Sequence, residues 1–182
     1  MKKIKFVPIF FCLLFIHIAD AKEKGELLQQ IKTIEEKVFP RGNLFDQRLD
    51  NIDLWNNLTR NIQEYINVAE NKKLNNMFIQ SERIAQNLIS TMQWVRLRVL
   101  SLSMSSGKVY SNYLLAKNRI NKLKENKEEL DRNIKELKKM KLMGSQVILQ
   151  FILLLERLID RAVIDLQVVG KKLRPSALFS SG

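Results

Sequence analysis

Apolar residues recur at steps of three and four along most of this chain, and that spacing is the period of an α-helix. The stretches that show it predict helices over residues 27–38, 52–69, 74–99, 108–141 and 145–173. Asn71-Lys72-Lys73 could be a turn between the second and third stretches or a polar turn of one long helix, and the pattern does not decide. Because the breaks are short, consecutive helices should run antiparallel. We therefore expect an all-α fold, an antiparallel four- or five-helix bundle with a coiled-coil-like hairpin.

The fourth stretch carries a seven-residue repeat of apolar positions. We call this repeat the heptad row; it consists of Val109, Ala116, Leu123, Leu130 and Leu137. Such spacing is typical of helices that pack along a coiled-coil seam. Lys127 lies between two members of the heptad row, at a position where a coiled-coil seam has a further apolar residue. It interrupts the pattern and predicts a hydrated end of the seam. We expect Val109, Leu123, Leu130 and Leu137 to form an exposed seam that a protein partner could bind.

The fifth stretch is the most apolar segment after the N-terminus and is nearly apolar all round in its first half. A helix of this kind is usually buried at the centre of a helical domain. The alternative is a segment that inserts into a membrane. The run from Leu142 to Leu155 contains only 14 residues before Glu156 interrupts it, whereas a spanning helix needs about 20. We expect a core helix.

The first 21 residues have the order of a secretory signal: lysines, an apolar run over residues 6–18, and Ala19-Asp20-Ala21. Cleavage after Ala21 would leave a helical domain over residues 22–174 and a short tail over residues 175–182. An uncleaved anchor and a lipoprotein are the alternatives, but Cys12 lies inside the apolar run, where no working signal would precede it. The signal predicts a periplasmic or secreted protein.

Composition restricts the chemistry open to the exported chain. Removal of residues 1–21 would remove Cys12 and His17, the chain's only cysteine and histidine. Zinc sites need cysteine or histidine, and the common nucleophilic triads need histidine. No GxxxxGK[ST] or GxGxxG sequence occurs. We therefore expect no enzyme activity, no cofactor and no metal.

The charge of the exported chain is strongly positive, with 28 basic and 18 acidic residues and a net charge of +10. A protein of this charge is attracted to anionic lipids and anionic polymers. Two clusters stand out as a candidate basic surface: Lys138, Lys139 and Lys141 at the end of the fourth stretch, and Lys171, Lys172 and Arg174 at the end of the fifth. In an antiparallel hairpin they lie at opposite ends. This separation disfavours a continuous track for nucleic acid, and it leaves a protein partner (self or other) and peripheral contact with an anionic membrane.

The Met-Lys-Lys-Ile-Lys start, the Lys-, Asn- and Ile-rich composition and the cysteine-poor helical body resemble the small exported helical proteins of Borrelia spirochaetes. These include surface adhesins and evasion factors, usually lipoproteins, and prophage-encoded, BlyB-like holin accessory proteins. The chain departs from the lipoprotein pattern because it lacks a credible lipobox. We expect a non-enzymatic interaction protein that binds a protein partner. The alternatives are a membrane-active or lysis-accessory protein and an adhesin for anionic host polymers.

Overall fold

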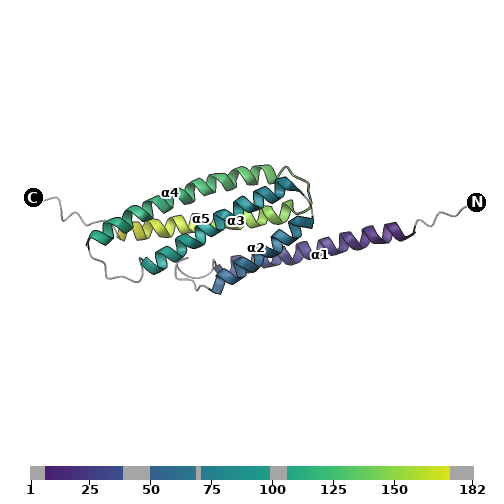
Figure 1. The fold of residues 1–182 in the computed structure, drawn as a ribbon, viewed down its shortest axis with the longest axis horizontal. Helices are drawn as coiled ribbons and strands as arrows, with labels where there is room; N and C mark the ends of the chain where they lie inside the picture. Colours follow the sequence, from purple (N-terminus) through teal and green to yellow (C-terminus); the bar gives the residue numbers. More distant parts are fainter. Residues whose placement is uncertain (1–6, 39–49, 69–70, 99–105, 173–182) are drawn as a thin grey trace, which may run out of the picture.

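The computed structural model describes residues 7–38, 50–68, 71–98 and 106–172. All secondary structure in these ranges is α-helical, which confirms the all-α prediction. The five helices are α1 (Val7–Val38), α2 (Asp50–Val68), α3 (Lys72–Arg98), α4 (Ser106–Leu137) and α5 (Ser145–Lys172) (Figure 1). None of the described helices is long and apolar enough to cross a membrane.

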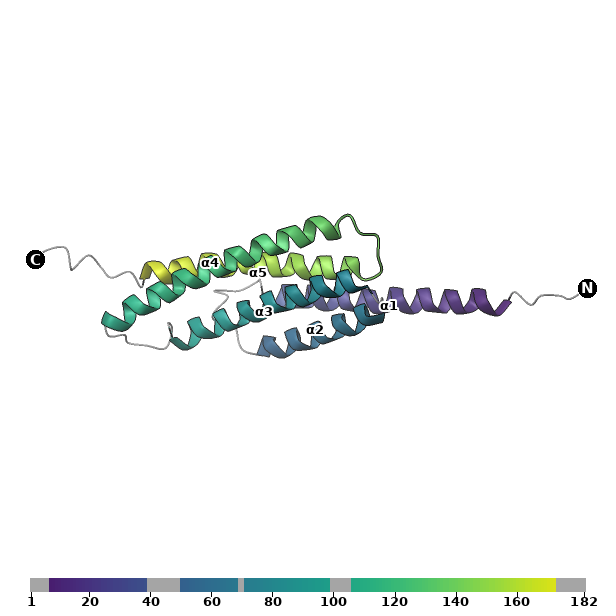
Figure 2. The same cartoon turned by 45° about the horizontal axis from the view of Figure 1, so that its top comes forward.

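Helix α5 occupies the middle of the helical body, where it packs against α4, α3 and α1 (Figures 1 and 2). Helices α4 and α5 run in opposite directions and are joined by residues 138–144, which we call the lysine loop. Helix α2 packs against α1 and α3. The N-terminal turns of α1 project alone beyond the other helices, at the end of the body where the lysine loop lies.

The central position of α5 follows from its apolar circumference. Phe151 is fully buried, and its ring lies 5.7 Å from the rings of both Trp55 on α2 and Phe78 on α3. Edge and tilted aromatic pairs at this separation add to the free energy gained from area burial. The other fully buried side chains of α5 are Val147, Ile148, Ile152, Leu154, Leu155, Ile159, Ala162 and Leu166. The prediction that this segment is a core helix is confirmed for the described structure.

The structure answers the open question at residues 71–73: α2 and α3 are separate helices, and Lys72 and Lys73 are the first residues of α3. The side-chain Oδ1 of Asn71 accepts hydrogen bonds from the backbone N–H groups of Lys73 and Leu74, both at 3.1 Å. An asparagine in this position satisfies N–H groups at a helix start that have no partner within the helix. Helix α3 therefore begins at Lys72 as a separate element.

Two predicted boundaries differ from the structure by more than two residues. The first helix was expected over residues 27–38 but begins at Val7, so the signal-like segment and the packed segment form one continuous helix. Burial nevertheless starts where the pattern placed it, because Leu27 is the first buried side chain among those described from Ala21 onward. The fourth helix ends at Leu137 rather than Lys141, since Lys138 to Lys141 turn the chain towards α5.

Candidate docking surfaces

The heptad row is not an exposed seam, which corrects our expectation. Leu123, Leu130 and Leu137 are 1%, 0% and 2% exposed and belong to the core shared with α5. The side chain of Val109 lies outside the described residues. A seam of this kind forms wherever two helices pack closely, and here the second helix belongs to the same chain. The heptad spacing is therefore satisfied internally.

Lys127 was expected to mark a hydrated end of the seam, but its ammonium group contacts acidic residues of α5. Nζ lies 2.6 Å from Oδ1 of Asp160 and 3.9 Å from a carboxylate oxygen of Glu156. The hydrogen bond to Asp160 raises the pKa of Lys127, partial burial opposes the rise, and the charges of Asp160, Glu156 and Asp131 add to it. The interruption in the apolar pattern is thus an ion-pair link between α4 and α5.

A second row of residues at seven-residue spacing escaped the sequence analysis because its members are polar. We call it the polar row; it consists of Asn112, Arg119, Asn126 and Asn133. The three asparagines are buried, at 9%, 3% and 8% exposure. The polar row repeats with the same seven-residue period as the heptad row. This repeat was the signal in the sequence that could have indicated a second buried side of the helix.

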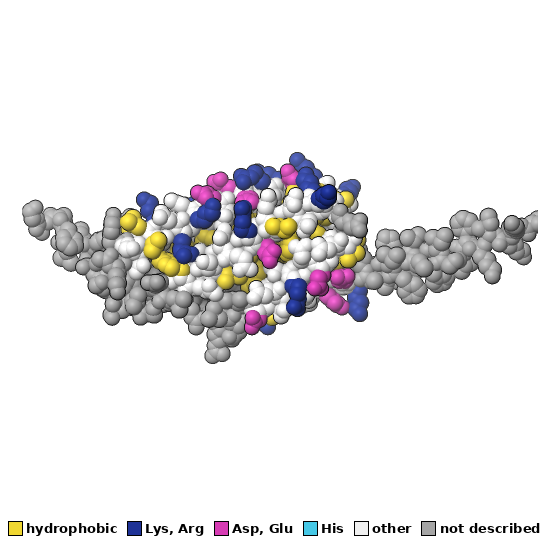
Figure 3. Space-filling view, in the orientation of Figure 1, with side chains coloured by type: hydrophobic (Ala, Val, Ile, Leu, Met, Phe, Trp, Pro, Cys, Tyr) yellow, Lys and Arg dark blue, Asp and Glu magenta, His cyan; other side chains and the backbone are white. Residues whose placement is uncertain are grey.

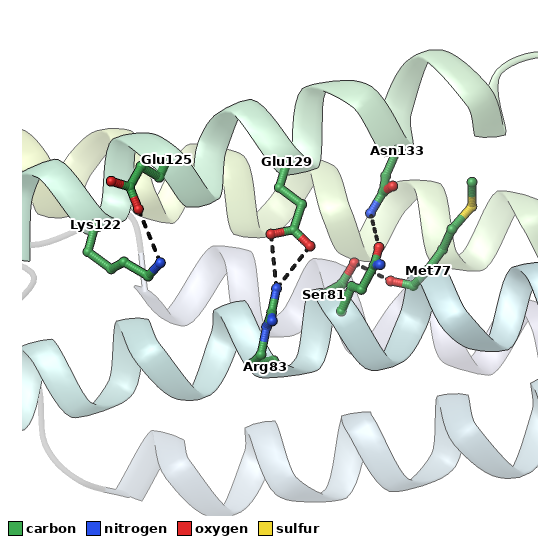
Figure 4. A network of polar contacts seen from close by, with 8 residues as sticks. Met77, Ser81, Arg83, Lys122, Glu125, Glu129 and Asn133 are labelled. Atoms are coloured by element: carbon green, nitrogen blue, oxygen red, sulfur yellow. Dashed lines mark hydrogen bonds and ion pairs between the residues drawn. The ribbon is translucent and has the colours of Figure 1, made fainter.

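The polar row faces α3. Arg119 donates a hydrogen bond to Oγ1 of Thr91 at 3.2 Å and lies 4.9 Å above the ring of Trp94. Burial lowers the pKa of Arg119. Nδ2 of Asn133 is 3.5 Å from Oε1 of Gln80 on α3, within the group of polar contacts in Figure 4. Nδ2 of Asn126 is buried and has no hydrogen-bond partner in the described part of the chain.

Ion pairs flank the same interface near the surface. Arg83 on α3 contacts both carboxylate oxygens of Glu129 at 3.0 Å (Figure 4). Lys73 contacts Glu136 at 2.9 Å. Solvent-exposed pairs of this kind contribute little free energy each. Their positions fix the side-by-side register of α3 and α4.

The first candidate basic cluster is exposed at the lysine loop. Lys138, Lys139 and Lys141 are all exposed, and basic side chains gather along the edge formed by α4 towards this end (Figure 3). In the second cluster Lys171 is exposed, whereas the side chain of Lys172 and all of Arg174 lie outside the described residues. Since α4 and α5 run in opposite directions, the lysine loop and the C-terminal end of α5 lie at opposite ends of the body (Figure 1).

A pocket of about 440 Å³ opens beside the lysine loop. Lys24 of α1, Lys138 and Lys141 line it together with Tyr65 of α2. The remaining lining is apolar or uncharged, and no carboxylate belongs to it: Leu137, Met140, Leu142, Met143, Gly144, Ser145, Gln146 and Leu149. The pocket therefore combines three cations with an apolar wall and could hold an anionic group attached to an apolar body.

The lysine loop has a fixed shape. Gly144 is buried with a positive φ of 80°, and a Cβ at this position would meet the side chains of Tyr65, Ile66 and Leu74 at about 4 Å. Glycine adopts this backbone region without the steric cost other residues have. The hydroxyl of Ser145 donates to the carbonyl of Leu142 at 2.7 Å. The side chains of Leu142 and Met143 are thereby held in solvent, 44% and 41% exposed.

The described residues contain no cluster of histidine, cysteine, aspartate and glutamate that could hold a metal ion. A pocket of about 460 Å³ between α1 and α2 is lined mainly by amides and apolar groups, including Gln30, Asn61 and Leu54. Its lining contains no acidic side chain. The lysine loop is therefore the site in which charge, shape and exposed apolar surface coincide.

No protein-family model matches the chain, and neither the curated proteins nor the solved structures include a significant match.

Proposed function

We propose that the chain is an exported, non-enzymatic helical interaction protein that binds a protein partner, itself or another chain, outside the cytoplasm. We further propose that its architecture is a five-helix bundle in which α4 and α5 form a coiled-coil-like hairpin. Because Leu123, Leu130 and Leu137 are buried, the partner surface must lie elsewhere. The observation that carries the proposal is an exposed apolar ridge on α5.

The ridge consists of Ile164 and Val168, one helical turn apart and 55% and 49% exposed. Their neighbours Ala162 and Leu166 are fully buried, so the ridge is the outer side of a core helix. Helix α1 covers α5 as far as the ion pair between Glu35 and Arg157, at 2.9 Å, and ends at Val38. The ridge lies beyond that point. Exposed aliphatic side chains on a core helix gain free energy when a second apolar surface covers them.

Export is supported by the way α1 packs. Ala21, Lys22 and Glu23 are exposed, and the described side chains enter the core only from Leu27. The proposed cleavage point therefore lies six residues before the first buried side chain described in α1. N-terminal sequencing of protein from the native envelope should find Lys22 as the first residue. A first residue of Met1, or a lipid on Cys12, would contradict the proposed export.

The partner surface can be tested by photo-crosslinking in the native host. A photoreactive residue in place of Val168 should give one discrete adduct whose mass identifies a second copy or a different chain. The change Ile164→Lys should abolish the adduct, because a buried ammonium group has a high desolvation cost. The same photoreactive residue at Gln167, exposed on the same helix, is the matched control. An equal adduct from Gln167, or no adduct from Val168, would contradict the ridge as the partner surface.

The two alternatives differ in what supports them. A lysis-accessory function through insertion of α5 would require this helix to leave the body and expose Phe151, Leu155 and Ile159, all fully buried. An adhesin for anionic polymers would use the exposed lysines of the lysine loop. Contact between that loop and an anionic surface is supported by the three lysines that line the pocket beside it.

A further inference from the structure

The end of the body formed by the lysine loop combines exposed lysines, which form no ion pair with the described residues, with two adjacent exposed apolar side chains and a pocket whose lining contains no carboxylate. We propose that this end docks on the surface of a lipid bilayer that carries anionic headgroups. Lys24, Lys138 and Lys141 would contact headgroup phosphates, and Leu142 and Met143 would enter the interface. The proposal does not depend on the protein partner at the α5 ridge.

The lysines are available for an external anion. Lys24, Lys138, Lys139 and Lys141 form no ion pair with any residue that the structure describes. Three of them line the pocket of about 440 Å³, from which carboxylates are absent. Lysines near an anionic bilayer each contribute to binding, with an attraction that falls off within a Debye length. The charge at this end is therefore complementary to a phosphate-bearing surface.

The apolar side chains favour a bilayer over a soluble polyanion. Leu142 and Met143 follow Lys141 directly and remain more than 40% exposed. Sulfated or nucleic-acid polymers offer such side chains no apolar environment, whereas the acyl boundary of a bilayer does. The positive φ of Gly144 and the hydrogen bond from Ser145 to Leu142 both favour this loop conformation, and a loop that keeps its bound conformation when free binds more tightly.

The direction of α1 gives a second argument, which rests on the proposed export. The N-terminal turns of α1 leave the body at the end occupied by the lysine loop (Figures 1 and 2). While the signal segment is held at the membrane during export, this end of the body is the one nearest to the bilayer. The lysine loop would meet the headgroups as the chain emerges.

The test compares variants of the full chain, so the N-terminal segment is the same in all of them. Co-sedimentation would be measured with vesicles of phosphatidylcholine alone and of phosphatidylcholine mixed with phosphatidylglycerol. The double change Lys138→Gln/Lys141→Gln should weaken binding to the anionic vesicles about 30-fold at low ionic strength. Lys117→Gln/Lys124→Gln removes two exposed lysines from the middle of α4 and should weaken it less than about threefold.

The apolar contribution has its own matched pair. Some binding should persist at about 0.5 M salt, where the Debye length is only about 4 Å. Leu142→Ser/Met143→Ser should lower the affinity of this salt-resistant binding about tenfold. Leu114→Ser/Leu115→Ser changes two adjacent α4 residues of similar exposure, 41% and 43%, and should leave that binding unchanged. A fluorophore sensitive to its surroundings, on Leu142→Cys in a Cys12→Ser background, should shift to the blue on vesicles.

Three results would overturn the proposal. Equal losses from the two lysine pairs would mean that only net charge matters. Equal losses from the two apolar pairs would mean that the lysine loop has no special role. Tight binding to heparin that displaces the vesicles, with no effect of Leu142→Ser/Met143→Ser on either ligand, would identify the end as a polyanion site instead. The photo-crosslink at Val168 should be unchanged in the loop variants, so failure at one end is distinguishable from failure at the other.

Discussion

The two sides of α4 follow the same seven-residue period but are built from opposite chemistry. On the side that faces α5, Leu123 and Leu130 are almost fully buried. On the side that faces α3, Asn126 and Asn133 are buried nearly as deeply, at 3% and 8% exposure. Burial of leucine releases apolar surface from water and provides most of the free energy of folding. A buried amide must first replace its hydrogen bonds to water and contributes little net free energy.

This contrast indicates that the α4–α5 and α3–α4 interfaces have different roles. The α4–α5 contact supplies stability, whereas the α3–α4 contact restricts how the helices align, since Arg119–Thr91 and Asn133–Gln80 form only in one register. Polar residues at a helix interface can fix register at a cost in stability. Every variant below tests this division, beginning with the largest expected effect.

Leu155→Asp should abolish the cooperative thermal unfolding of the protein. The side chain of Leu155 is fully buried in the core. The substitution therefore places an unpaired carboxylate in an apolar environment, at a cost of several kcal/mol. Circular dichroism during heating measures the outcome. A melting curve like that of the wild type would show that the apolar interior of α5 does not stabilise the fold.

Leu130→Ala should lower the free energy of unfolding by about 2–5 kcal/mol, the usual cost of truncating a fully buried leucine. The matched change on the other side is Asn133→Ala, which removes one long hydrogen bond of 3.5 Å and should cost about 1 kcal/mol. Urea unfolding of the two variants gives both values. Equal losses would remove the proposed contrast between the two sides of α4.

Asn126→Leu should raise the free energy of unfolding by about 1–2 kcal/mol. The amide nitrogen of Asn126 is buried without a partner in the described structure, and a buried donor left unpaired costs about 1–3 kcal/mol. An apolar side chain of similar size removes that cost. A loss of stability, measured by urea unfolding, would mean that the amide has a partner or that the site is too small for leucine.

Lys127→Met should have the smallest effect, a loss of less than about 1 kcal/mol, because the ion pair with Asp160 is partly exposed to solvent. The folded-state pKa of Lys127 is raised. The stability that this shift contributes is therefore fully present below the unfolded-state pKa, about 10.4, and is lost as the pH rises through the folded-state value. The difference between the variant and the wild type should be constant near neutral pH and shrink in alkaline solution. Urea unfolding as a function of pH would show it; a difference that grows at high pH would contradict the assignment.

Sequence reasoning found the helices because the apolar period survives in nearly all of them. It located α5 to within a residue, since Gly144 and the change in apolar pattern mark its start. It also identified the candidate lysines, as a run of cations is visible in any sequence. It did not recognise the polar row, because asparagine at a regular spacing has the same appearance on a solvated helix face as at a buried interface.

The sequence alone determined the helical class, the apolar positions of the helices and the positive charge, because each of these depends on local periodicity or on composition. Only the tertiary structure decided which surfaces are buried between helices and which remain exposed to solvent. Burial depends on neighbours that are distant in the chain: the leucines of the heptad row join the core shared with α5, and Arg119 and Asn133 contact α3. The same folding places Lys24 of α1 in one pocket with Lys138 and Lys141. No pattern along the chain specifies that these three lysines lie close together.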